Sequence, residues 1–328
     1  MAHFVPDAKK RYRDFCLEEK SIPLFSRDWW LDAACGEENW DVVVIENNNI
    51  IIGTMPYYKK TKFGMRILSQ PKLTGKLGPW IKPSESSSET KYSTELAKQK
   101  DIMEMFIQQL PKYSYFTQSW PSSMKNWLPF YWKGFQQTTR YSYILEDISN
   151  LEKIWDDLQE NIRRDIRKAS NRFLLRVRHD LSIDDLLTLN RSIFEHQGKK
   201  VPYEDEFFKR LDAACQKQNC GQILIAEDEE GRHHAGYYII WDENSAHGLI
   251  GGGNPALRNS GATSLCMWEA IRHASTVTQK FDFEGSMIEP IERFFRAFGA
   301  VQTPYFQISR TPSRFIRTVE FLRSLKNS

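Results

Sequence analysis

The sequence has few cysteines, almost no net charge and no long apolar run. Its 328 residues include five cysteines, and none of these forms a CxxC pair, which argues against a disulfide framework and a structural zinc site. The 45 basic and 42 acidic residues leave a formal net charge of +3, so whole-protein binding to nucleic acid is not expected. No apolar stretch approaches the roughly 18–20 residues that span a bilayer, and the charged N-terminus does not resemble a secretory signal. We therefore expect a cytoplasmic protein without integral membrane contact.

Several catalytic signatures are also missing. The chain has no GxSxG element of a serine hydrolase, no GK[ST] of a Walker A loop and no HExxH zinc motif. A dinucleotide is not expected, because no acidic residue follows the glycine-rich segment at the Rossmann spacing. The sequence therefore predicts no metal site. Its apolar fraction of 41% is enough for a sizeable core, in one large domain or two ordinary ones.

Two segments share one pattern, residues 41–58 and residues 222–240. In each, an apolar β-branched run is followed by a polar turn and a second run, which predicts a β-hairpin. Gly53 lies a few residues before a tyrosine pair, and Gly236 lies directly before one. This likeness predicts two related halves, with chance similarity as the alternative. A helix-cap pattern at Ser149-Asn150 places the boundary near residue 147.

The remaining patterns predict a mixed α/β (α+β) architecture. In the first half they are a Ser-rich surface loop at 83–100, a helix at 100–110 and strands at 113–118 and 138–145. In the second half they are helices at 151–171, 183–196, 203–218, 261–273 and 291–298, strands at 173–178, 280–283 and 303–309, and a closing basic helix.

A glycine run followed by a helix start is the strongest candidate for phosphate binding. The segment GLIGGGNPALRNSGA runs from Gly248 to Ala262. Exposed backbone N–H groups at a helix start bind anions, and glycine lets a phosphate approach closely. Arg258 adds a charge-assisted donor, and Asn259, Gly261 and Ala262 complete the candidate site. The alternative is a glycine-rich turn with an ordinary helix cap.

Two carboxylates at the end of one strand are the candidate catalytic groups. Asp282 and Glu284 are two residues apart, so both side chains point to the same side of a strand. Such a pair fits a general base and its orienting partner. Arg296 follows on the next helix as a candidate for stabilising an oxyanion. The alternative for Arg296 is a surface ion pair with Glu292, four residues before it.

Two basic segments are candidates for an anionic ligand. The first is residues 161–178, in which helical spacing places four cations on neighbouring faces: Arg163, Arg164, Arg167 and Lys168. The second is residues 47–83, which contains no acidic residue and interleaves lysines with aromatic rings, including Tyr57 and Tyr58. A solvated surface is the alternative for both segments.

The segment FDFEGSMIEPIERFFRAFG, residues 281–299, resembles the FemAB/FemX group and the wider GNAT-fold (Gcn5-related N-acetyltransferase) acyltransferases. The likeness lies in Phe281-Asp282-Phe283 with Gly285, and in Phe295-Arg296 with Phe298-Gly299. A basic helix with Asn161, Arg163-Arg164 and Ile166 to Ala169 is also similar to that group. The whole-chain layout looks like an uncharacterised bacterial GNAT-like family. The resemblance covers residues 150–310, with a weaker echo in 20–145.

This resemblance implies two tandem GNAT-like domains, each a mixed, mostly antiparallel sheet flanked by helices. Residues 1–147 would be a degenerate, acceptor-side domain, and residues 148–328 would carry the donor site and catalysis. The implied reaction moves an acyl group from an acyl-CoA-type co-substrate to a small-molecule or peptide amine, with no tightly bound cofactor. One alternative is a FemAB-like transfer from aminoacyl-tRNA to a peptidoglycan precursor of the cell wall. Another is a non-catalytic binding module, which Thr263 favours because Ala or Gly is usual there.

The resemblance also implies roles for the candidate residues. Asp282 or Glu284 would deprotonate the acceptor amine, and Arg296 or backbone N–H groups would stabilise the oxyanion. Arg258 and the helix start at Gly261 would hold the donor phosphate. Tyr57, Tyr58 and the Arg164 face of the basic helix would line an acceptor cleft between the halves.

Overall fold

A computed structural model describes residues 7–83, 91–196, 198, 204–285, 287–313 and 316. Its contacts divide the chain into unit 1, Met1–Arg140 with Pro304–Ser328, and unit 2, Tyr141–Thr303. The domain boundary near residue 147 remains a prediction. Residues 84–90 of the Ser-rich loop predicted over 83–100, and nearly all of the closing basic helix, fall outside the described residues. The loop prediction is wrong for residues 92–100, which already belong to a helix that runs from Tyr92 to Gln109. Within the described residues, no helix is both long and apolar enough to cross a membrane.

Unit 1 is built on a strand order β1-β2-β3-β5-β12. The pairs are antiparallel except β3 with β5, and the short β4 joins β2. Its strands are β1 (Trp40–Asn47), β2 (Ile50–Lys62), β3 (Met65–Ser69), β4 (Trp80–Ile81), β5 (Tyr115–Ser119) and part of β12 (Val301–Arg310). Its helices are α1 (Ala8–Glu18), α2 (Asp28–Cys35), α3 (Tyr92–Gln109) and α4 (Leu128–Trp132).

Alternation along β1 divides the core of unit 1 into two layers. Trp40, Val42 and Val44 pack in one cluster with residues of α1 and α2. Val43 and Ile45 pack in the other cluster with residues of α3. The sheet of unit 1 is therefore covered by helices on both faces.

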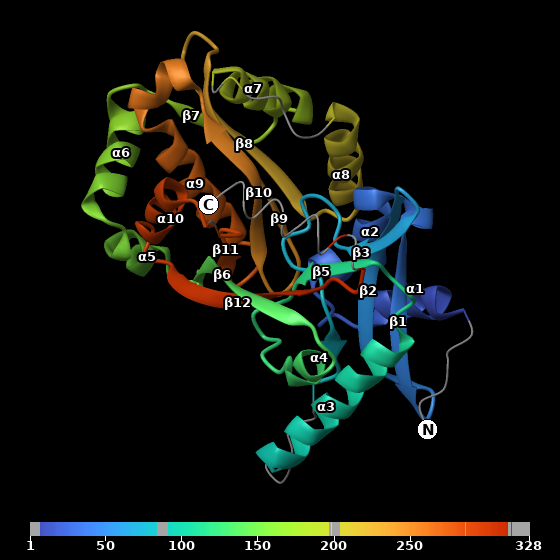
Figure 1. The fold of residues 1–328 in the computed structure, drawn as a ribbon. Helices are drawn as coiled ribbons and strands as arrows, with labels where there is room; N and C mark the ends of the chain where they lie inside the picture. Colours follow the sequence, from blue (N-terminus) through green and yellow to red (C-terminus); the bar gives the residue numbers. More distant parts are fainter. Residues whose placement is uncertain are drawn as a thin grey trace. The chain divides into compact units, whose positions relative to one another are not determined.

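Unit 2 has the strand order β6-β11-β10-β9-β8-β7. The pairs are antiparallel except β10 with β11. Its strands are part of β6 (Gln136–Leu145), β7 (Arg176–Arg178), β8 (Gly221–Glu227), β9 (His233–Trp241), β10 (Ala246–Gly253) and β11 (Phe281–Asp282). Its helices are α5 (Leu151–Asp157), α6 (Glu160–Asn171), α7 (Ile183–His196), α8 (Asp205–Lys217), α9 (Ala262–Ala274) and α10 (Glu289–Arg296). The α7 and α8 helices lie on one side of the sheet, and α6 and α9 lie on the other (Figure 1).

The single helix predicted over 151–171 is wrong, because the structure divides it into α5 and α6. Asn150 caps the first helix as expected, accepting a hydrogen bond from the Lys153 amide at 3.0 Å. Leu158 then takes an extended conformation, with ψ 137°. The Gln159 amide donates to the Ala297 carbonyl at 2.9 Å, and this bond holds the break between the helices.

The two predicted hairpins are confirmed, and they share a structural detail. Gly53 of β2 lies opposite Ile45, and Gly236 of β9 lies opposite Ile225. A Cβ atom on Gly53 would lie 2.8 Å from Ile102 of α3, and one on Gly236 would lie 2.5 Å from Leu186 of α7. In each unit, the glycine lets a helix pack closely on the hairpin. This correspondence agrees with the predicted tandem, mostly antiparallel architecture.

Candidate functional site

The strands β10 and β11 separate soon after they meet. They pair in parallel at Ala246 with Phe281 and at His247 with Asp282. The β10 strand then continues beside β9 to Gly253, while β11 ends and Phe283 donates its amide to Tyr143 of β6. Beyond His247, the described chain pairs no strand with this edge of β10. Figure 1 shows β10 running on past the short β11.

A cluster of three side chains lies where these strands separate. The Nδ1 atom of His247 is 2.7 Å from Oε1 of Glu284. Asp282 is buried, with 4% of its surface exposed, and it accepts hydrogen bonds from the Ser142 hydroxyl and, at 2.8 Å, from the Glu284 amide. One ligand atom from each of His247, Asp282 and Glu284 lies within 4.8 Å of the others, so the set could hold a metal ion. The sequence identified both carboxylates but not His247.

The backbone at Glu284 has an unusual conformation. Its φ is +58°, and φ is also +58° at Gly285. A non-glycine residue in this left-handed region costs about 1–2 kcal/mol. A Cβ on Gly285 would lie 2.2 Å from the Tyr141 carbonyl. The chain thus turns sharply where β11 ends, and such strain is concentrated at functional sites.

The carboxylates also act on a buried tyrosine of the neighbouring strand. Burial is the main cause that raises the pKa of Tyr237, and the charges of Asp282 and Glu284 raise it further. The ring lies beside the glycines of β10, since a Cβ on Gly248 or Gly251 would strike it. Tyr237 is therefore a neutral phenol that fills the space next to the cluster.

The predicted donor-phosphate residues differ in their exposure. Arg258 and Asn259 are exposed in a 3-10 helix, Pro255–Ser260, whereas Gly261 and Ala262 are buried. Gly261 has φ +82°, and a Cβ on it would lie 2.3 Å from the Asp165 carbonyl of α6. Glycine at this position therefore allows the start of α9 to pack against α6. A role of these four residues toward phosphate stays a prediction.

Arg296 lies in a network on α10. Its Nε donates to Oε1 of Glu292 at 2.9 Å. The same carboxylate accepts a hydrogen bond from the Tyr143 hydroxyl at 2.6 Å, and Gln302 donates to that hydroxyl at 2.8 Å. The hydrogen bond from Tyr143 and that from Arg296 hold the pKa of Glu292 below its usual range. These contacts position Arg296 beside β6, and its oxyanion role stays a prediction.

Three of the four cations on the basic face of α6 form hydrogen bonds or ion pairs within unit 2. Arg163 donates to the Asp156 carbonyl at 2.9 Å, at the end of α5, and it pairs with Glu160. Arg167 pairs with Glu160 at 3.6 Å, and Lys168 pairs with Asp165 at 3.3 Å. Arg164 is exposed. Arg163 therefore has a structural use that the helical spacing did not indicate.

The two predicted tyrosines of unit 1 lie at consecutive positions of β2. Tyr57 is buried, and burial raises its pKa, with a further contribution from Asp41. It lines a pocket of about 440 Å³ that also contains Lys59, Lys60 and Arg66. The carboxylate of Asp41 belongs to the same lining and pairs with Lys59 at 3.5 Å. Tyr58 is half-buried, and the Lys60 ammonium lies 5.6 Å from the centre of its ring. This pocket combines positive charge with an aromatic ring.

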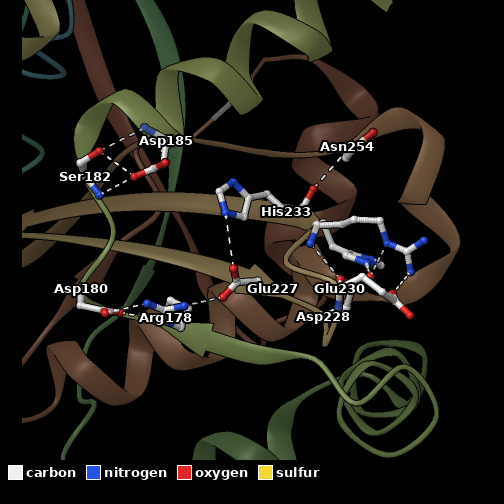
Figure 2. Close-up of polar contacts among 11 residues, drawn as sticks. Arg178, Asp180, Ser182, Asp185, Glu227, Asp228, Glu230, His233 and Asn254 are labelled. Atoms are coloured by element: carbon white, nitrogen blue, oxygen red, sulfur yellow. Dashed lines mark hydrogen bonds and ion pairs between the residues drawn. The ribbon is translucent and has the colours of Figure 1, made fainter.

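A second polar group lies near the β8–β9 turn, and its charges pair with one another (Figure 2). Arg178 bridges Asp180 at 2.7 Å and Glu227 at 2.6 Å. Burial opposes ionisation of Asp228, but hydrogen bonds from His234 and from Arg232 hold its pKa well below the usual range. These contacts connect β7, β8 and β9. The charged residues of this group therefore have a structural role.

Comparison with known families finds a match within unit 2. Residues 157–289 match the family model described as "Acetyltransferase (GNAT) domain". This range contains α9, β10, β11 and the cluster of His247, Asp282 and Glu284. This part of unit 2 is therefore similar to a GNAT acetyltransferase domain. No curated protein sequence matches the chain.

Solved structures with low sequence identity share the fold of this chain. FemX is 10% identical with a TM-score of 0.68, and the match covers 97% of this chain and 99% of FemX. The C-terminal domain of a putative lysylphosphatidylglycerol synthetase from Agrobacterium fabrum is 9% identical, with a TM-score of 0.55 and coverage of 96% and 95%. A tandem GNAT protein from the clavulanic acid biosynthesis pathway is 8% identical, with a TM-score of 0.53 and coverage of 94% and 97%. These likenesses confirm the predicted tandem GNAT-like fold.

Proposed function

We propose that the protein transfers an acyl group from an acyl-CoA-type thioester to an amine acceptor, and that unit 2 supplies the donor site and the catalytic groups. The observation that carries this proposal is the separation of β10 from β11 beside His247, Asp282 and Glu284. The pantetheine arm of coenzyme A is extended and contains amide groups. Such a ligand is suited to hydrogen-bond an open strand edge, as peptides do in β-augmentation.

The glycine-rich end of β10 supports the donor side of the proposal. A ligand that follows β10 beyond His247 passes Gly251, Gly252 and Gly253, whose backbone it can approach closely. Next along the chain are the exposed Arg258 and Asn259 and then the start of α9. An arginine and a helix start suit the phosphates at the far end of coenzyme A.

The acceptor side of the proposal rests on unit 1. The pocket beside Tyr57 has an excess of positive charge, with three cations against Asp41, and an aromatic ring. This combination suits an acceptor amine carried on an anionic molecule. Tyr58 of the same unit is a further candidate for acceptor contacts. The reaction would take place in the cytoplasm, where acyl-CoA is made.

An aminoacyl-tRNA donor is the second candidate. It is favoured by the likeness to FemX over nearly the whole of both chains and by the exposed cations of α6, such as Arg164, which suit an RNA backbone. In that case the acceptor would be a peptidoglycan precursor, and the enzyme would serve the cell wall.

The two donors are distinguished by a direct assay. Purified protein is incubated with acetyl-CoA, with a long-chain acyl-CoA, or with tRNA charged with labelled amino acids, each with amino sugars and lysine-containing peptides. The proposal predicts thiol release and an N-acylated product with an acyl-CoA. Product from charged tRNA alone would favour the second candidate. Absence of product and of donor-induced thermal stabilisation with every donor would contradict both.

A further inference from the structure

We propose that His247 is the proton acceptor of this reaction and that Glu284 is its positioning residue. The inference rests on the proposed function and deepens it, because it assigns the general base to a histidine that the sequence did not reveal. His247 lies on β10 directly opposite Asp282 of β11. It is the histidine that the fold brings to the point where the two strands separate.

The hydrogen bond to Glu284 determines the tautomer of His247. A carboxylate only accepts hydrogen bonds, so the Nδ1 atom of His247 must donate across the 2.7 Å that separates it from Oε1. The neutral imidazole then carries its basic lone pair on Nε2. The side chains of His247 and Glu284 are 13% and 14% exposed, so the pair is shielded but still accessible to a substrate.

Glu284 reaches His247 because the strained turn holds it there. Its φ of +58° takes the chain out of the strand direction after Phe283. Its amide donates to Asp282, whose Oδ1 atom also accepts from the Ser142 hydroxyl. The buried Asp282 thus anchors the turn, and the turn presents the Glu284 carboxylate to His247. This arrangement gives Asp282 a structural part and Glu284 an orienting part.

The observed separation favours a hydrogen-bonded pair over two metal ligands. Charge-assisted N–H···O bonds have lengths of about 2.7–2.9 Å, which matches the 2.7 Å between Nδ1 and Oε1. Two ligand atoms about 2.0–2.1 Å from a tetrahedral zinc ion would be roughly 3.3 Å apart. The geometry therefore suits proton transfer as it stands, whereas zinc binding would require the side chains to move.

The proposed step balances as follows. The neutral amine nitrogen forms a bond to the acyl carbon, and the carbon–sulfur bond of the thioester breaks. The proton that the nitrogen loses passes to Nε2 of His247, and the imidazolium then gives it to the leaving thiolate. The products are an amide and a free thiol. The Glu284 carboxylate stabilises the imidazolium between the two transfers.

The titratable groups around His247 decide how the rate depends on pH. Glu284 and Asp282 approach it from β11 and its turn, and Tyr237 lies on the neighbouring strand β9. Both carboxylates favour the charged imidazolium, whereas Tyr237 stays neutral. In Glu284→Gln one of the favourable charges is lost, so the pH profile of the rate should differ from that of the wild type.

The first test does not depend on turnover. Long-range ¹H–¹⁵N NMR spectra of the wild type and of His247→Asn identify the His247 signals by difference. The proposal predicts that the neutral imidazole carries its proton on Nδ1 and has an unprotonated Nε2. The opposite tautomer would overturn it, even if no substrate has been found. Failure of the proposed function alone would leave this tautomer in place but show no acyl transfer.

The second test uses the rate. His247→Ala should lower acyl transfer about 10²–10⁴-fold, and added imidazole should restore part of it. His233→Ala is the matched control. His233 is the first residue of β9 and lies outside the cluster, so this variant should keep the wild-type pH profile. The proposal is overturned if His247→Ala keeps the wild-type rate and profile. It is equally overturned if a chelator abolishes activity and Zn²⁺ restores it, since His247 would then be a metal ligand.

Discussion

Substituting Gly285 tests the strained turn that holds the proposed catalytic cluster of His247, Asp282 and Glu284. Gly285 has φ +58°, and a Cβ there would lie 2.2 Å from the Tyr141 carbonyl and 2.7 Å from Cα of Ser142. Both are backbone atoms of β6, so the contact cannot be relieved by rotating a side chain. In Gly285→Ala the turn must therefore shift, and Glu284 must move with it.

Two costs add in this variant. Alanine in the left-handed region costs about 1–2 kcal/mol, and overpacking a close contact typically costs about 1–3 kcal/mol. We expect the free energy of unfolding to fall by about 2–5 kcal/mol. Gly64→Ala separates the backbone cost from the overpacking cost, because Gly64 has φ +71° with no atom within 4 Å of an added Cβ. This control should be destabilised only by the cost of placing alanine in the left-handed region.

The assay is urea denaturation followed by circular dichroism, combined with the acyl-transfer rate of the folded protein. Gly285→Ala should be less stable than Gly64→Ala by about 1–3 kcal/mol. It should also lose most of its activity, whereas Gly64→Ala keeps it. Equal stabilities of the two variants, or full activity in Gly285→Ala, would refute the role assigned to the turn.

Further predictions concern packing, capping and pH. Gly53→Ala and Gly236→Ala should each destabilise their unit by about 1–3 kcal/mol in urea, because each Cβ would meet a packed helix; unchanged stability would contradict the hairpin correspondence. Arg163→Ala should lose about 0.5–1.5 kcal/mol through the hydrogen bond to the end of α5, while Arg164→Ala stays within about 0.5 kcal/mol. Burial and then the nearby His179 lower the pKa of His273, so the unfolded chain binds this proton more readily and stability should fall as pH drops below about 6.5. A variant with asparagine in place of His273 should lose part of that pH dependence, as measured by thermal unfolding from pH 8 to 5.

The hairpins could be predicted from the sequence because their pattern is local. Each β-branched run and its polar turn lie within about twenty residues, and the glycine opposite Ile45 or Ile225 belongs to the same segment. The bounds predicted for α7 agree with the structure, since its apolar spacing is regular. Local periodicity and caps thus account for much of the secondary structure.

The break between α5 and α6 depends on distant residues. Leu158 continues the apolar spacing of the predicted helix, and no proline or glycine interrupts it. The break follows from the bond between the Gln159 amide and the Ala297 carbonyl. A pattern confined to residues 151–171 does not contain this information.

The sequence predicts only part of the site, because the remaining contact also joins residues that are distant in sequence. Asp282 and Glu284 are neighbours in sequence, and alternation predicts a shared side of the strand. His247 lies 37 residues before its partner Glu284, so their contact depends on the pairing of β10 with β11. A lone histidine just before the glycine-rich stretch was the available signal.

The central claim is that an acyl-CoA-type donor lies along the open edge of β10 in unit 2. Hydrogen–deuterium exchange with mass spectrometry tests this directly, with a slowly reacting acyl-CoA analogue added to the protein and no acceptor present. The account predicts slower exchange in peptides covering residues 248–253 and the start of α9, with unit 1 little changed. Slower exchange confined to unit 1, or none in β10 under saturating donor, would contradict it.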